Sequence, residues 1–159
     1  MHRNMSRPIQ AVPLLAAQLA DYQQRWPNET ATVQAFLDLL QDVQDPFLRE
    51  RLAGHFTSGA WLVSADGARI LMTHPRKLER WLQLGGHADG DRDMGRVALK
   101  EAQEESGLPG LSVEGDAIFD LGNFAVNNDL PDDALPALLE RYRGTVTRST
   151  LARLILMRI

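Results

Sequence analysis

The sequence contains no cysteine, and this absence removes two classes of structure at once. Disulfide bonds cannot form, and metal sites built on thiolates are excluded. A chain without cysteine fits a reducing compartment, so we expect a cytoplasmic protein. No apolar run reaches the length of a membrane span, and the first residues lack the apolar stretch of a secretory signal. We therefore expect no membrane partner.

An excess of positive charge is also missing. Lys and Arg number 17 against 21 Asp and Glu, which gives a formal net charge of −4. General affinity for nucleic acid requires a basic surface, so we expect no nucleic-acid partner. The hydrophobic fraction of 44% and the charged fraction of 24% are typical of a globular protein. A chain of 159 residues is long enough for one domain with a real core.

The first third of the chain has helical periodicity. A helix is expected from about Ala11 to Arg25, because apolar residues recur there at helical spacing until Pro27 interrupts the pattern. Asn28 or Thr30 can cap a second helix. The apolar stripe of that second helix comprises Val33, Phe36, Leu37 and Leu40.

A short third helix is expected from about Pro46 to Leu52, with the proline as an early helical residue. We interpret residues 1–53 as an N-terminal helical extension without chemistry of its own. Residues 54–159 then form the main domain.

Strand patterns follow from residue 54. Residues 54–64 and 69–73 are strand-like, and the Asp66-Gly67 pair between them is a strong hairpin signal. A short strand from Trp81 to Leu84 leads into two glycines, and residues 111–124 indicate one or two further strands. A helix is expected from Pro131 to Tyr142. This order predicts an α+β or α/β fold.

The last segment, residues 145–159, ends in an apolar run that fits either a strand or a short helix. An exposed segment of this kind would mark an interface or an aggregation site. We therefore expect it to be buried, either on the sheet of its own domain or against a second subunit in a homodimer.

The stretch that organises the chain is residues 84–108, LGGHADGDRDMGRVALKEAQEESGL. Gly107 and Pro109 are stop signals for the helix within it. Glu101, Glu104 and Glu105 have the spacing i, i+3 and i+4, which brings them to one surface of that helix.

The three carboxylates are predicted on the apolar side of this helix. With Val97 at 0° and about 100° per residue, Glu101 lies near 40°, Glu105 near 80° and Glu104 near 340°. The long side chains of Arg96, Gln103 and Lys100 point the other way. A solvated charge run, the ordinary interpretation of a Glu-rich helix, would instead place Glu beside Lys on the polar face. Carboxylates crowded at an apolar face require compensation, and a hard cation with oxygen ligands provides it.

This stretch resembles the signature of the Nudix hydrolases, G-x5-E-x7-R-E-U-x-E-E-x-G-U, where U is a bulky apolar residue. The glycines Gly86 and Gly107 match in register. So do Glu101, Glu104, Glu105 and Leu108. The resemblance covers about a sixth of the chain.

Three positions depart from the signature. Arg92 stands at the first Glu, Lys100 stands at the Arg, and Ala102 stands at the bulky apolar position. Asp91 and Asp93 flank the first Glu position and are candidates to replace it. Lys100 can orient a carboxylate or be solvated, and it lacks the bidentate fork of Arg.

The resemblance implies a mixed sheet between helices and a Mg²⁺- or Mn²⁺-dependent pyrophosphohydrolase. It implies metal ligands at Glu104, Glu105 and the Gly85 carbonyl. Glu101 would be a ligand through water or a general base. Gly85, Gly86 and Lys100 would line the cofactor site, and His87 is a weaker candidate for ligand or base. The implied substrate is a nucleoside diphosphate linked to another group.

Two other interpretations stay open. One is a non-catalytic nucleotide- or protein-binding module that keeps the signature with weakened metal affinity. Two features support it: Arg92, and a C-terminal third, from about residue 122, that is shorter in sheet and helix than the resemblance implies. The other is an isomerase of isopentenyl diphosphate on a similar scaffold. That chemistry in the related enzymes uses a cysteine, which this chain lacks.

Overall fold

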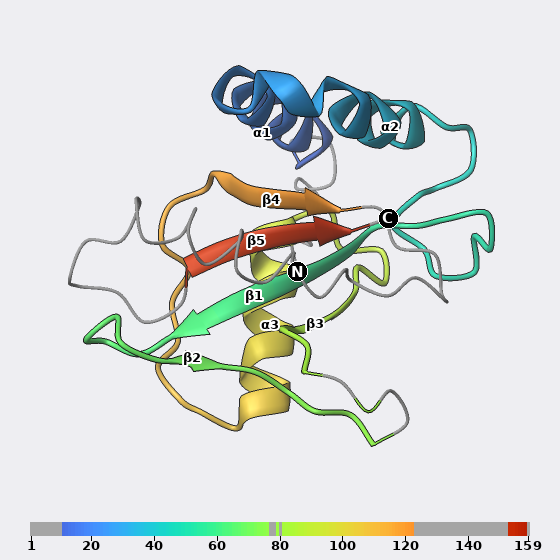
Figure 1. Cartoon of the computed structure of the whole chain (residues 1–159). Coiled ribbons are helices and arrows are strands. Elements are labelled where there is room, and N and C mark those ends of the chain that lie inside the picture. The colour runs from blue at the N-terminus through green and yellow to red at the C-terminus, as the bar shows by residue number, and fades with distance from the viewer. Residues whose placement is uncertain (1–10, 77–78, 80, 123–152, 159) are drawn as a thin grey trace, which may run out of the picture.

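A computed structural model describes residues 11–76, 79, 81–122 and 153–158, and these form a mixed α+β fold (Figure 1). The expected mixture of helix and strand is confirmed. In the described part of the chain, no helix is long and apolar enough to cross a membrane. The helices are α1 (Ala11–Arg25), a 3-10 turn η1 (Pro27–Glu29), α2 (Thr30–Leu40) and α3 (Met94–Ser106); the strands are β1 (Thr57–Val63), β2 (Ile70–Leu71), β3 (Leu84–His87), β4 (Ile118–Gly122) and β5 (Arg153–Arg158).

The sheet is built around β1, which has neighbours on both edges. Along one edge β1 pairs with β5, and β5 pairs in turn with β4. Along the other edge β2 and β3 share the strand: β2 pairs with Leu62 and Val63, and β3 pairs with residues 57–60. All pairings of β1 are antiparallel, whereas β4 and β5 are parallel. The sheet is therefore mixed.

The hairpin prediction is confirmed. β1 and β2 are joined by the turn at Asp66-Gly67, in which the Gly67 N–H donates to the Ser64 carbonyl at 2.8 Å. Gly67 has a φ of 70°, the left-handed conformation that glycine adopts without strain. The strand before the signature begins later than expected: β3 starts at Leu84 and contains both glycines, which were expected to follow the strand.

The predictions of the two N-terminal helices are confirmed, and the prediction of a third helix from Pro46 to Leu52 is wrong. Residues 46–54 form successive turns, because two carbonyls at the start of the segment bond to residues outside it. The Pro46 carbonyl accepts from the Phe56 N–H at 2.7 Å, and the Phe47 carbonyl accepts from the Gly90 N–H at 2.8 Å. An α-helix would require these carbonyls for its own ladder.

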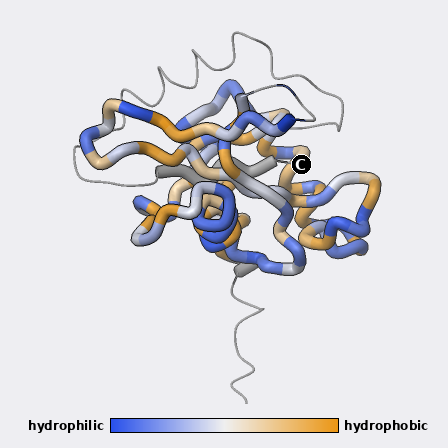
Figure 2. The backbone as a smooth tube through the Cα atoms, turned by 90° about the horizontal axis from the view of Figure 1, so that it is seen from below, coloured by the Kyte–Doolittle hydropathy of each residue, from blue (hydrophilic) through white to orange (hydrophobic). Residues whose placement is uncertain are grey.

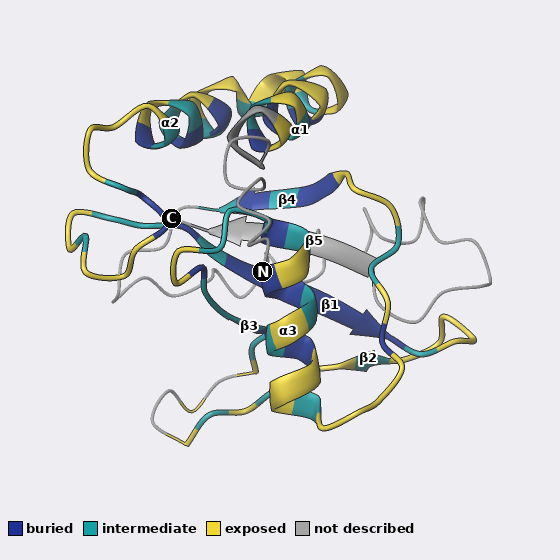
Figure 3. Ribbon diagram, turned by 180° about the vertical axis from the view of Figure 1, so that it is seen from behind, coloured by how far each residue is buried: buried dark blue, intermediate teal, exposed yellow. Residues whose placement is uncertain are grey.

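The core has two parts on the face of the sheet that carries α3, which Figure 3 shows in front of β1. Helix α3, which is seen end-on in Figure 2, is mostly hydrophilic, and its buried residues are Met94, Val97, Ala98 and Ala102. Its C-terminal half packs on β1 and β3. Its N-terminal half joins α1 and α2, which lie beyond the β4 edge (Figure 1). The first part comprises Ala60, Leu62, Leu84, Ala98, Ala102 and Leu111; the second includes Leu15, Leu19, Tyr22, Phe36, Phe56, Val97, Ile118 and Leu121.

Side chains from before and after residue 53 share this second cluster, so the helical extension packs into the core of the main domain. The division into two units at residue 53 stays a prediction. The opposite face of the sheet carries a separate apolar cluster of Trp61, Val63 and Phe119 with Ile70 and Met72. Among the described elements, α3 is the helix that covers a sheet face.

The C-terminal third lies largely outside the described residues, and this includes the expected helix Pro131–Tyr142. Within the last segment, Arg153–Arg158 is a strand. Its backbone lies inside the sheet of its own chain, between β1 and β4. Of the expected strands in residues 111–124, β4 is the one found among residues 111–122.

Candidate functional site

Helix α3 is held at both ends, by Asp93 at its start and by the predicted stop signal Gly107 at its end. The Asp93 carboxylate caps the first turn by accepting from the Arg96 N–H at 3.0 Å. Gly107 ends the helix in the left-handed conformation, with a φ of 68°. From the strand side, the buried Ser58 hydroxyl donates to the Met94 carbonyl at 2.8 Å. The helix is therefore fixed against β1 and β3, and the carboxylates of Glu101 and Glu105 are carried to the two glycines.

The Glu101 carboxylate lies directly against Gly86. The side chain is only 15% exposed. A Cβ atom at position 86 would come within 2.5 Å of the Glu101 carboxyl carbon. Only glycine at position 86 leaves this space for the carboxylate.

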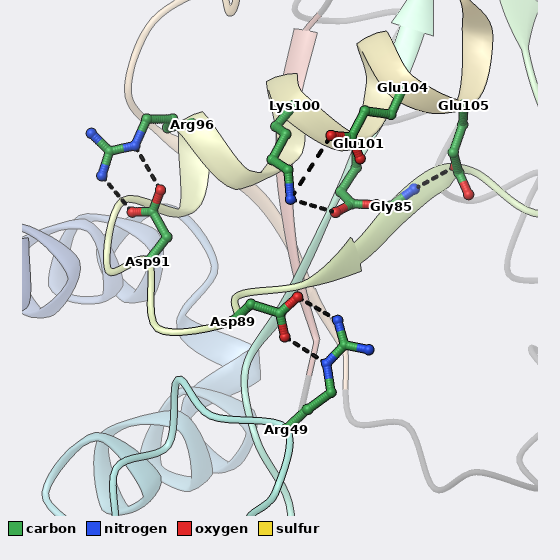
Figure 4. Close-up of polar contacts among 9 residues, drawn as sticks. All are labelled: Arg49, Gly85, Asp89, Asp91, Arg96, Lys100, Glu101, Glu104 and Glu105. Atoms are coloured by element: carbon green, nitrogen blue, oxygen red, sulfur yellow. Dashed lines mark hydrogen bonds and ion pairs between the residues drawn. The ribbon is translucent and has the colours of Figure 1, made fainter.

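The Glu105 carboxylate is bound to the neighbouring glycine. The Gly85 N–H donates to Glu105 Oε2 at 3.0 Å (Figure 4). In an antiparallel pair, both backbone groups of a strand residue point to the same edge. The Gly85 carbonyl is therefore directed to the edge of β3 on which Glu105 lies, away from β1.

Glu104 is placed differently from the prediction. It is 61% exposed, so it does not share the apolar face, and Glu105 is exposed as well. Both lie in the last turns of α3, beyond the helix's buried positions. Lys100 was expected to point away, but its Nζ lies 3.8 Å from Glu101 Oε1 and 4.0 Å from Glu104 Oε1 (Figure 4). Its flexible stem carries the charge back to the carboxylates.

Burial raises the pKa of Glu101 above its usual range. Lys100 opposes this rise in the pKa, while Glu104, Glu105 and Asp89 add to it by charge repulsion. Without a bound cation, the Glu101 carboxylate is thus held in a less favourable state than in water.

The position of the first signature Glu does not face this site. The Arg92 guanidinium donates to Asp45 Oδ2 at 2.6 Å and lies over the Phe47 ring, 4.7 Å from its centroid. The idea that Asp91 or Asp93 replaces the missing Glu is not supported: Asp91 holds Arg96 with two hydrogen bonds, and Asp93 caps α3. Each has a structural partner of its own, and Figure 4 shows that of Asp91.

His87 is paired with a second histidine. Its Nδ1 lies 2.8 Å from Nε2 of His55, so one of the two rings must be neutral in order to accept the hydrogen bond. Burial lowers the pKa of His87, and the charge of Arg49 and the proximity of His55 lower it further. No local pattern indicated that these rings would pair, because the strand register brings them together from residues 32 apart.

Two further residues were missed. Arg49, in the segment assigned no chemistry, makes two hydrogen bonds to Asp89 directly after β3 (Figure 4). Arg49 holds the pKa of Asp89 below its usual value. No local pattern in the sequence indicated that Asp89 would pair with a residue 40 positions earlier.

The donors present suit a hard cation. The carboxylates of Glu101, Glu104 and Glu105 and the Gly85 carbonyl offer oxygen atoms of the kind that Mg²⁺ and Mn²⁺ prefer as ligands. The space beside Gly86 is filled by the Glu101 carboxylate, whose pKa is raised and whose charged form a cation would stabilise. Among the residues that the structure describes, no three His, Asp or Glu side chains are grouped closely enough to form a metal cluster.

Comparison of the chain with protein-family models, with curated proteins and with solved structures finds no match in any of the three. The resemblance to the Nudix signature therefore depends on the sequence of residues 84–108 alone.

Proposed function

We propose that this protein is a Mg²⁺- or Mn²⁺-dependent hydrolase of a diphosphate linkage in a nucleoside diphosphate derivative, with a Nudix-like arrangement of sheet and helices. The observation that carries the proposal is the meeting of α3 with the edge of β3. There the Glu101 carboxylate fills the space at Gly86, and the Glu105 carboxylate accepts from the Gly85 N–H.

Charge gives the physical reason for a metal. The described groups around the two glycines include four carboxylates, Asp89, Glu101, Glu104 and Glu105, and two cationic side chains, Arg49 and Lys100. A diphosphate carries further negative charge and would be repelled by such a site. A bound divalent cation would neutralise this charge and lower the pKa of a bound water.

The chain's own residues have distinct parts in this proposal. Glu104, Glu105 and the Gly85 carbonyl would hold the cation. Glu101, whose pKa is raised by burial, is the best placed to accept a proton from water. Lys100 orients the Glu101 carboxylate, although it acts as a point charge where the signature has the fork of an arginine.

The alternative of a non-catalytic binding module has one specific observation in its favour. Arg92 occupies the first Glu position of the signature and is engaged with Asp45 and Phe47, so this position supplies no carboxylate to the site. A site with one carboxylate fewer is expected to bind its cation more weakly.

A calorimetric titration with Mg²⁺ and Mn²⁺, followed by hydrolysis assays on nucleoside diphosphate derivatives, separates the two functions. The hydrolase requires saturable metal binding and metal-dependent release of a phosphorylated product. Metal binding without turnover across the panel would favour the binding module. Absence of both would remove the proposal.

A further inference from the structure

Arg49 makes an ion pair at the surface beside the carboxylates of α3. Its Nε donates to Asp89 Oδ1 at 2.6 Å, and its Nη2 donates to Asp89 Oδ2, so the guanidinium holds the carboxylate with both prongs of its fork (Figure 4). The two side chains are 52% and 39% exposed. Exposed ion pairs of this kind contribute little to folding stability, because water screens the charges.

The backbone around Arg49 is placed by other contacts. The Phe47 carbonyl accepts from the Gly90 N–H at 2.8 Å, and the Phe56 carbonyl accepts from the Ala88 N–H at 3.3 Å. The ion pair of Asp45 with Arg92 joins the same two segments. Arg49 would therefore remain at this place if its side chain released Asp89.

The charges of this pair act on the site. The Asp89 hydrogen bond is the main cause of a raised pKa at Arg49, and Glu101 contributes to it. Conversely, Lys100 is among the charges that lower the pKa of Asp89, after the dominant effect of Arg49. Arg49 and Lys100 thus lie within electrostatic reach of the same carboxylates.

We propose that Arg49 is the residue that binds a phosphoryl oxyanion of the diphosphate, and that Asp89 is its counter-ion until the substrate arrives. A guanidinium fork matches two phosphate oxygens as well as it matches a carboxylate. When a phosphate replaces the Asp89 carboxylate, the Arg49 guanidinium keeps two hydrogen bonds and the backbone does not have to move. This inference depends on the proposed function, because it names the group that holds the substrate of that site.

The ion pair of Arg96 with Asp91 is a matched control for the pair of Arg49 with Asp89. Arg96 holds Asp91 with the same two-pronged geometry, at 2.6 and 2.5 Å, and these side chains are 60% and 29% exposed. Neither residue belongs to the proposed site. Figure 4 shows this second pair apart from Glu101 and Gly85, toward the start of α3.

The test is calorimetric binding of methylenediphosphonate, whose carbon bridge is not hydrolysed, to the full chain in the presence of Mg²⁺. Arg49→Ala should weaken binding about ten- to a hundredfold, the usual effect of losing charge-assisted hydrogen bonds. Arg49→Lys should lie between, and Arg96→Ala should match the wild type.

Asp89→Asn should change the affinity for methylenediphosphonate in the opposite direction. Asp89 has a φ of 50°, a conformation that asparagine also adopts readily, so the turn should be kept. Without the competing carboxylate, methylenediphosphonate should bind more tightly than to the wild type, whereas Asp91→Asn should have no such effect.

Three results would overturn the inference: wild-type binding that Arg49→Ala leaves unchanged, equal losses in Arg49→Ala and Arg96→Ala, or weaker binding by Asp89→Asn. In each of these the proposed function would stand, because the wild type still binds. A wild type that binds Mg²⁺ but not methylenediphosphonate would instead remove the proposed function and this inference together.

Discussion

The carboxylate of Glu101 occupies the space that a side chain at position 86 would fill. This contact joins a helix residue to a strand residue 15 positions earlier in the chain, and it explains why position 86 is a glycine in this protein. The neighbouring glycine, Gly85, has a different role. A Cβ there would come within 2.7 Å of the Gly59 Cα and of the Ser58 carbonyl oxygen, which belong to the backbone of β1.

These two glycines give opposite predictions. Gly86→Ala should displace the Glu101 carboxylate, which is the end of a flexible side chain. Metal-dependent activity should then fall by about tenfold or more, which corresponds to about 1.4 kcal/mol or more in activation free energy. Its free energy of unfolding should stay within about 1 kcal/mol of the wild type. Gly85→Ala should destabilise the fold by about 1–3 kcal/mol, because strand backbones must separate.

Urea unfolding and activity assays on both variants check this contrast. An unaltered activity in Gly86→Ala would mean that the position of the Glu101 carboxylate does not matter. A wild-type stability in Gly85→Ala would contradict the close packing of β3 on β1.

Glu101→Gln should stabilise the metal-free protein at neutral pH. Because burial raises the pKa of Glu101 in the folded state, its ionisation is less favourable there than in the unfolded chain. The stability of the wild type relative to the variant is thus highest below the unfolded pKa of about 4.3, and it falls as pH rises through the folded pKa. Denaturant unfolding in the presence of a chelator should show that the variant's gain in free energy of unfolding over the wild type increases from acid to neutral pH. A difference independent of pH would contradict the assignment.

Arg92→Glu should not restore a metal ligand. The side chain at position 92 is directed to Asp45 and Phe47, so a glutamate there would face another carboxylate. We expect a loss of about 1–2 kcal/mol in stability from the ion pair and the ring contact, with Mg²⁺ affinity unchanged. Arg92→Met keeps the packing on Phe47 without the charge and serves as the control. Tighter Mg²⁺ binding by Arg92→Glu, measured by calorimetry, would show that this position reaches the site.

Deletion of residues 145–159 should give an aggregating or unfolded product. This deletion removes β5, whose backbone lies between β1 and β4, and it would leave both neighbours with unpaired edges. Light scattering gives the mass of the intact chain and of the deletion product, and it also tests the expected homodimer. A soluble, monomeric and active deletion product would show that β5 is dispensable.

Local signals in the sequence were sufficient where the chain interacts with its own neighbours. Helix α1 has the limits that its periodicity and Pro27 indicated, and α3 ends at the expected Gly107. The Asp66-Gly67 turn forms the expected hairpin. In each case the deciding contacts are only a few residues apart.

Long-range contacts decided the rest. The segment at Pro46 looks helical by itself, but its carbonyls bond to Phe56 and Gly90. The helical wheel placed Glu104 by angle alone, whereas its exposure depends on how far the sheet extends along α3. The Arg49–Asp89 pair depends on two loops meeting, which no local pattern records.

The most direct test of the proposed function is Mg²⁺-dependent hydrolysis of a panel of nucleoside diphosphate derivatives by the wild type, Glu104→Gln and Glu105→Gln. Both substitutions keep the size of the side chain, and the amide in Glu105→Gln would retain an oxygen to accept from the Gly85 N–H, so the fold should be intact by circular dichroism. We predict that the wild type hydrolyses at least one derivative only when Mg²⁺ or Mn²⁺ is present, and that both variants lose this turnover. Near-normal hydrolysis by either variant, or hydrolysis that persists in a chelator, would contradict the account.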